Sequence, residues 1–210
     1  MPIKYSCFIS YRHDSVNIAK DFQDALESEL SLLINLPVYR DEERLHAGEF
    51  FNTALASALC QSACMVMIYI PRYFDETSTY CAREYRAMEQ LETQRIEKLK
   101  KNGSNNSTGL IIPVVYRGLE ILPQKISTNR HFHNFEPYFL GGRTLKNNKK
   151  YLTAIKDIAG YIFYRCQDLN KLPADPCSRC DDFEIPSKAK VSSWLNTMLP
   201  PRRSFPGRRV

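Results

Sequence analysis

The sequence predicts an α/β fold in which helices flank a parallel sheet. Short apolar runs, each about the length of one strand, alternate along the chain with segments that have helical periodicity. Strands that alternate with helices form βαβ units, and the strands of such units run parallel. The 210 residues are 43% hydrophobic, which supplies enough apolar surface for one core.

Four apolar runs are the predicted strands. The first, KYSCFIS, is apolar without alternation, which is typical of a strand covered on both faces. In order along the chain, the strands are expected at residues 4–10, 36–40, 64–70 and 110–116. A further short extended piece is expected around Tyr138–Leu140.

Helices are predicted where apolar side chains recur every three or four residues. These segments are 16–34, 49–63, the part of 75–101 that follows Thr79, and 149–169. Asp14 or Ser15 is expected to cap the first helix, and Ser78 or Thr79 the third. The segment 129–139 is rich in His and aromatic residues, and we expect it to pack on the sheet edge rather than to stack on nucleobases.

A change in composition divides the chain at Leu172. Residues 1–172 form the predicted domain, and residues 173–210 are a Cys-, Pro- and Arg-rich extension that is not an independent domain. We expect this extension to be dispensable for the core fold. The net charge of +6 includes four arginines among the last nine residues. This pattern favours a solvated tail over an arm that binds nucleic acid or membrane.

The cysteines and the hydropathy indicate the compartment. We expect no secretory signal, and the longest apolar run, ACMVMIYIP, is too short to span a bilayer. Most of the seven cysteines lie in apolar runs, so Cys7, Cys60 and Cys64 are interpreted as small core residues in a reducing compartment. The expected location is therefore cytoplasmic.

One C-x-x-C pair, Cys177 and Cys180, lies in the extension. A structural zinc site needs four ligands, and no second pair is evident, although Cys166, His131 or His133 would be available as further ligands. We therefore expect no metal.

Polar side chains follow two of the predicted strands. Tyr11, Arg12 and His13 come after the first strand, and Arg40 and Asp41 end the second. Ligands of parallel α/β sheets bind at the carboxyl ends of the strands, so this edge is the expected site. On charge alone, ordinary loop polarity explains the pattern equally well.

Three segments in order resemble the Toll/interleukin-1 receptor (TIR) domain family. FISYR at 8–12 resembles the family's first box, and residues 38–59 resemble its second strand, BB loop and following helix. Residues 61–85 resemble its third strand and the segment after it, which ends in the motif Trp-Cys-x-x-Glu. The resemblance covers about residues 4–168 and implies a flavodoxin-like fold with a five-stranded parallel sheet.

Many TIR domains cleave the nicotinamide–ribose bond of NAD, and the resemblance places the family's catalytic carboxylate at Glu84. Tyr80 stands where Trp is commoner, but its ring keeps a flat face for stacking. Without the resemblance, the sequence does not distinguish Glu84 from Glu89, Glu92 and Glu97, and the expected interpretation is a carboxylate on the surface of a helix. The chemistry suits a single carboxylate: nicotinamide leaves as a neutral molecule, and an anion stabilises the positive charge that develops on the ribose.

The resemblance also implies the residues that bind NAD. Tyr11 and Arg12 are expected to contact the ribose or the diphosphate, which the planar guanidinium fork of arginine suits. Asp41 and Arg44 lie in the BB loop, and Phe50 begins the helix after it, where it is expected to pack on nicotinamide. Two alternatives stay open: Phe50 is a core residue, and Arg44 is a solvated charge.

The expected function is that of an NAD+ nucleosidase that releases nicotinamide. Its product would be ADP-ribose or a cyclic or conjugated signalling nucleotide, as in the stand-alone bacterial TIR proteins of Thoeris-type anti-phage systems that the chain resembles. NAD+ is the substrate and no cofactor is expected. The expected partners are a second copy, which docks on the BB loop (residues 41–48) to cover a shallow, open site, and a separate effector protein. The alternative is a non-catalytic adaptor module, or a host-mimicking bacterial protein, that signals by TIR–TIR assembly.

Overall fold

Five parallel strands form the central sheet of the computed structural model. The structure describes residues 3–41, 49–104, 108–139, 145, 148–173, 176 and 180–198. The strand order is β2-β1-β3-β4-β5, which is the flavodoxin-like order, and every neighbouring pair is parallel. The predicted fold class is therefore confirmed. The strands are β1 (Tyr5–Ser10), β2 (Val38–Arg40), β3 (Ser62–Tyr69), β4 (Ile111–Val115) and β5 (His133–Asn134).

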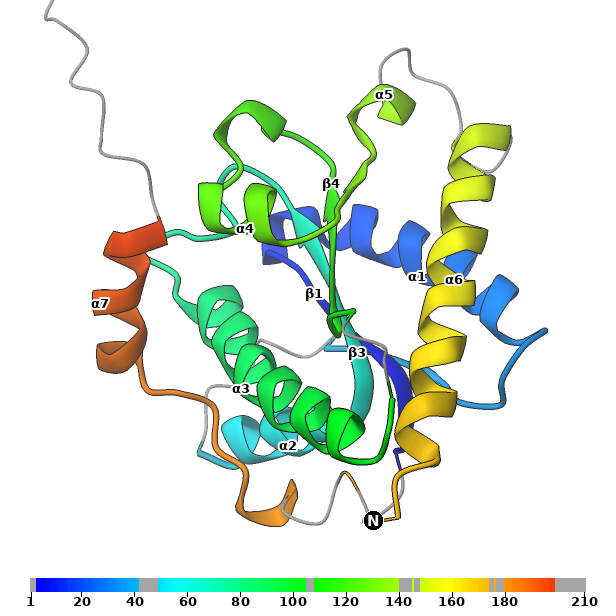
Figure 1. The fold of residues 1–210 in the computed structure, drawn as a ribbon. Helices are drawn as coiled ribbons and strands as arrows, with labels where there is room; N and C mark the ends of the chain where they lie inside the picture. Colours follow the sequence, from blue (N-terminus) through cyan, green and yellow to red (C-terminus); the bar gives the residue numbers. More distant parts are fainter. Residues whose placement is uncertain are drawn as a thin grey trace, which may run out of the picture.

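Helices cover both faces of this sheet (Figure 1). The helices α1 (Val16–Leu30) and α6 (Lys149–Asn170) pack together over one face, and α2 (Glu49–Cys60) and α3 (Tyr80–Lys101) lie over the other. The last described helix, α7 (Lys188–Met198), packs against α3. The remaining described elements are short: η1 (His13–Ser15), η2 (Leu119–Ile121), α4 (Gln124–Asn129), α5 (Glu136–Phe139) and η4 (Cys180–Asp182).

The central strands are apolar because helices bury both of their faces. Every residue of β3 is buried, and so are all five residues of β4. Cys7 of β1 lies directly opposite Cys64 of β3, and both are fully buried with free thiols. For these two residues, the structure agrees with their interpretation as small core residues.

The fifth strand lies earlier in the chain than predicted. It is His133–Asn134, whereas Tyr138 belongs to α5 and Leu140 lies outside the described residues. The side chain of Asn134 accepts a hydrogen bond from the backbone N–H of Glu136 at 3.0 Å, which favours a helix start there. Phe135 is fully buried against Tyr138, so this aromatic segment packs on the sheet edge as expected.

Helix ends also differ from the predicted ones. The first helix stops at Leu30 instead of residue 34. Ser15 is its N-cap residue, but the hydroxyl of Ser15 donates to the Arg12 carbonyl and caps nothing. Thr79 is the N-cap residue of α3, again without a side-chain capping bond.

A disulfide joins the C-terminal extension to the domain. Cys60, at the end of α2, is buried in the core as predicted, but it is bonded to Cys180 of η4. Disulfides are typical of oxidising compartments, and this pair therefore gives no support to the reducing compartment inferred from the cysteines. Sequence patterns missed the bond because pairing across 120 residues depends on the tertiary fold.

The extension also packs on α3. The ring of Trp194 stacks on Tyr85 with centroids 5.8 Å apart and meets Phe74 edge-on. Arg83 donates from Nε to the carbonyl of Pro186 at 2.7 Å. Three side chains of α7 are buried in the core cluster: Val191, Leu195 and Met198. These contacts argue against the expectation that residues 173–210 are dispensable for the core fold.

Loss of the disulfide should lower the stability of the chain. We expect Cys180→Ser to reduce the free energy of unfolding by about 2–4 kcal/mol, because the unfolded chain is no longer cross-linked across a long loop. The measurement is thermal unfolding without reductant. Dithiothreitol should lower the melting temperature of the parent chain and leave that of Cys180→Ser unchanged. Equal melting temperatures for parent and variant would show that the bond adds nothing.

Candidate functional site

A crevice is expected where the sheet reverses its winding direction. In the order 2-1-3-4-5, the connections that leave β1 and β3 pass to opposite faces, and sheets of this order bind ligands outside the carboxyl ends of these two strands. Ser10 is the last residue of β1, and Tyr73 follows the end of β3. Helix α3 begins beyond Tyr73 and carries Glu84 in its second turn.

The carboxylate of Glu84 is hydrogen-bonded to the end of β1. Its Oε2 accepts a hydrogen bond from the hydroxyl of Ser10 at 2.5 Å. The Ser10 hydroxyl also lies 2.6 Å from the phenol oxygen of Tyr73. One carboxylate and two hydroxyl groups from three separate elements therefore meet at the reversal point of the sheet.

Glu84 is only 1% exposed. This burial contradicts the alternative of a surface carboxylate, and it also contradicts the expected shallow, open site. The physical reason is helical phase: Cys81, Glu84, Tyr85 and Met88 are spaced i, i+3, i+4 and i+7, and all four are buried on the sheet side of α3. An acidic residue on this apolar stripe needs a partner, and Ser10 supplies one.

Tyr11 links three elements at the same end of the sheet. Its hydroxyl donates to the backbone carbonyl of Asp41 at 2.6 Å, after the end of β2. Its own carbonyl accepts from the thiol of Cys81 in α3 at 3.3 Å. Tyr11 is 3% exposed, and the Arg40 guanidinium lies 5.8 Å from the centroid of its ring. Asp41 is also buried, with 5% exposure.

Arg12 lies beside the turn after β3. Its guanidinium donates to the carbonyl of Arg72 at 3.1 Å and approaches Asp75 at 3.4 Å. Asp75 accepts hydrogen bonds from the hydroxyl and the backbone N–H of Thr77, which, with Arg72 and Arg12 nearby, lower the pKa of Asp75 to about 2. Asp75 is therefore an anion at neutral pH, and its ion pair with Arg12 holds the Arg12 guanidinium beside this turn.

The remaining predicted site residues are only partly described. Tyr80 is the first residue of α3, one helical turn before Glu84, and is 45% exposed with the Arg83 guanidinium 5.8 Å from its ring centroid. Arg44 lies outside the described residues, as does the side chain of Phe50. The structure thus places five of the seven predicted residues at one end of the sheet: Tyr11, Arg12, Asp41, Tyr80 and Glu84.

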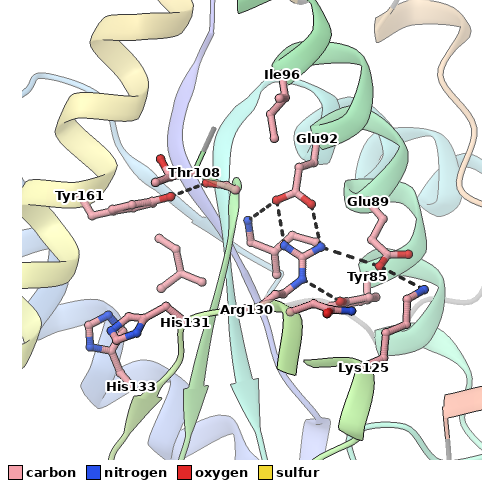
Figure 2. Close-up of a pocket in the computed structure, with 14 residues that line it drawn as sticks. Tyr85, Glu89, Glu92, Ile96, Thr108, Lys125, Arg130, His131, His133 and Tyr161 are labelled. Carbon is pink, nitrogen blue, oxygen red and sulfur yellow. Dashed lines mark hydrogen bonds and ion pairs between the residues drawn. The ribbon is translucent and has the colours of Figure 1, made fainter. Parts of the chain in front are cut away.

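A cavity of about 500 Å³ lies on another side of α3, near β4 and β5 (Figure 2), and Glu84 does not line it. Arg130 binds both oxygens of Glu92 at 2.9 and 2.7 Å and donates from Nε to the Tyr85 hydroxyl at 3.0 Å. Glu92 Oε1 also accepts from the backbone N–H groups of Leu110 and Ile111. Because these charges are bound to each other and to β4, we interpret the pair as structural and assign the site to the crevice at Glu84.

Two histidines lie at the rim of this cavity. The rings of His131 and His133 have centroids 5.7 Å apart (Figure 2). Burial, and then the neighbouring His131, lower the pKa of His133 below 6.5, so His133 is neutral at pH 7. Among the residues that the structure describes, no three His, Cys, Asp or Glu side chains are placed to hold a metal ion together. Within the same described ranges, no helix has both the length and the apolar character needed to cross a bilayer.

The strand order and the position of Glu84 define an α/β domain of the flavodoxin type with a buried acid where the sheet reverses its winding direction. A family profile described as TIR domain matches residues 7–138, which is more than half of the chain and extends from β1 into α5. The chain therefore belongs to the TIR domain family. A search among curated proteins finds no match.

Proposed function

We propose that the chain is an NAD+ nucleosidase that cleaves the bond between nicotinamide and ribose, with Glu84 as the catalytic carboxylate. The observation that supports this most strongly is the carboxylate at the switch crevice, where α/β sheets of this order bind their ligands. The exposed ring of Tyr80 one helical turn earlier offers a stacking surface beside it.

The proposed reaction needs an anion and no general acid. Nicotinamide is cationic in NAD+ and departs as a neutral molecule when the bond to the ribose carbon breaks with its electron pair. Positive charge then grows on the ribose, and a fixed carboxylate in a low-dielectric crevice stabilises it. Glycosides with poor leaving groups need two carboxylates, but this substrate needs one.

Other residues at the crevice would bind the rest of the substrate. Arg12 would contact the diphosphate and Tyr11 the ribose, because both follow the end of β1. Asp41, Arg44 and Phe50 would flank the nicotinamide ring.

The product would be ADP-ribose, or a cyclic or conjugated form made when another nucleophile captures the ribose cation. In this proposal a separate effector protein binds the nucleotide product and responds to it during anti-phage defence in the bacterial cytoplasm. In such a reducing compartment Cys60 and Cys180 would be maintained as thiols.

A second candidate function is a non-catalytic TIR module that signals by assembly. The 1% exposure of Glu84 favours it, because a ribose cannot reach a carboxylate that is covered in this way. Under the enzymatic proposal, activity requires a state in which Glu84 is uncovered. Incubation of the purified chain with NAD+, alone and with phage-infected lysate, followed by chromatography for nicotinamide, separates the two functions. No release under either condition would favour the assembly module.

Nicotinamide release should rise faster than linearly with protein concentration. We expect a second copy to dock on the BB loop (residues 41–48) and to stabilise the state in which Glu84 is uncovered, which the enzymatic proposal requires. The measurement is specific activity across a wide concentration series, with light scattering on the same samples. A constant specific activity in samples that stay monomeric would show that one chain contains the complete site.

A further inference from the structure

Beyond Glu84 itself, the crevice contains two buried hydroxyl groups to which no role has yet been assigned. Ser10 and Tyr73 are both fully buried, and they lie 63 residues apart in the sequence. Their oxygens are 2.6 Å apart, and the hydroxyl of Ser10 also donates to the carboxylate of Glu84. Burying two hydroxyl groups beside a carboxylate costs free energy unless all of their hydrogen bonds are made.

The hydrogens in this chain of contacts have a defined direction. The hydroxyl of Ser10 has a single hydrogen, and it donates that hydrogen to Glu84 Oε2. The contact between Ser10 and Tyr73 then needs a hydrogen from the phenol, and Tyr73 donates to the Ser10 oxygen. Each bond polarises the next, and both O–H dipoles point toward the carboxyl group of Glu84.

Aromatic packing fixes Tyr73 in this position. The ring of Phe74 meets the Tyr73 ring edge-on with centroids 4.8 Å apart, and Tyr69 lies on it at 6.2 Å. Phe74 also contacts Trp194 of α7 and Tyr85 of α3. The packing is continuous from the C-terminal helix to the phenol, which leaves Tyr73 little freedom to turn away.

From this geometry we infer that Ser10 and Tyr73 are positioning residues for Glu84. Tyr73 donates to Ser10, Ser10 donates to Oε2, and the two bonds together set the orientation of the carboxylate and stabilise its charge. This inference rests on the proposed NAD+ cleavage. Neither residue needs to touch the substrate, because both act through Glu84.

Two variants, each lacking one hydroxyl oxygen, test this pair of consecutive hydrogen bonds, here called the relay. Both are made in the full chain. Tyr73→Phe and Ser10→Ala each remove one hydroxyl group, and each should lower kcat for nicotinamide release by about tenfold or more while KM changes by less than about twofold. The matched controls are Tyr69→Phe, which removes a part-buried hydroxyl that donates to the Ile121 carbonyl, and Ser62→Ala, which removes a buried hydroxyl that donates to the Ala58 carbonyl. Neither control should change kcat. Thermal unfolding checks that each variant is folded, and if Ser10→Ala is not, Tyr73→Phe decides.

A second readout does not depend on activity. Infrared spectra of chain labelled with ¹³C-glutamate contain a carboxylate stretch of Glu84, which is identified as the band lost in Glu84→Gln. This band should shift in Tyr73→Phe and in Ser10→Ala, and stay in place in both controls.

The outcomes separate the relay from the reaction. An active parent chain whose kcat is unchanged or raised in both variants would overturn the positioning role, and so would an unshifted Glu84 band. A parent chain that releases no nicotinamide under any condition would overturn the proposed function, while the band would still decide whether the relay exists.

Discussion

Glu84→Gln should abolish nicotinamide release and leave the chain folded. The amide keeps the size of the side chain, and its oxygen can still accept from Ser10, so the packing of α3 is preserved. The negative charge that would stabilise the ribose cation is lost. Removal of one electrostatic contact of this kind costs about 10²–10³-fold in rate, and we expect at least that loss here.

The control for this variant is Glu97→Gln. Glu97 lies on the exposed side of the same helix, so it tests the same substitution without the crevice. Nicotinamide release and the melting temperature should both be unchanged in Glu97→Gln. An equal rate in Glu84→Gln and the parent chain would remove Glu84 from the reaction.

The largest effect on stability is expected at the ion pair beside β4. Arg130→Met would leave the carboxylate of Glu92 buried without its guanidinium partner, and breaking a buried pair in this way costs about 3–5 kcal/mol. For a chain of this length, the melting temperature should fall by roughly 10 °C. The measurement is thermal unfolding followed by circular dichroism.

A double variant identifies the physical cause. Adding Glu92→Gln to Arg130→Met removes the unpaired charge, and the amide oxygen can still accept from the N–H groups of Leu110 and Ile111. The double variant should therefore recover part of the lost stability. Lys125→Met is the surface control, because Lys125 is exposed and lies 3.7 Å from Glu89. If Arg130→Met and Lys125→Met have the same melting temperature, the buried pair of Arg130 and Glu92 contributes little to the stability of the fold.

The sequence was sufficient to predict the sheet, because its central strands are buried on both faces and read as continuous apolar runs. It did not locate β5, which has two residues and no apolar run of its own. The bond between Cys60 and Cys180 was missed because their spacing is compatible with many pairings.

Part of the candidate site could also be predicted. The resemblance to TIR domains identified Glu84, Tyr11 and Arg12, and all three lie at the carboxyl end of β1. The burial of Glu84 was missed, although helical phase carries the signal: Glu84 and Glu92 share the apolar stripe of α3, and Glu97 does not. The partners Ser10 and Arg130 could not be predicted, because hydrogen bonds across 74 and 38 residues depend on the tertiary fold.

The central claim is that this chain breaks the nicotinamide–ribose bond of NAD+ and that Glu84 is required. The most direct measurement follows NAD+ and free nicotinamide together, by proton NMR, in parallel samples of the parent chain and Glu84→Gln at a concentration where the parent chain is assembled. The account predicts one nicotinamide for each NAD+ lost with the parent chain and none above the protein-free background with Glu84→Gln. Equal curves for the two proteins, or no loss of NAD+ with an assembled parent chain, would contradict it.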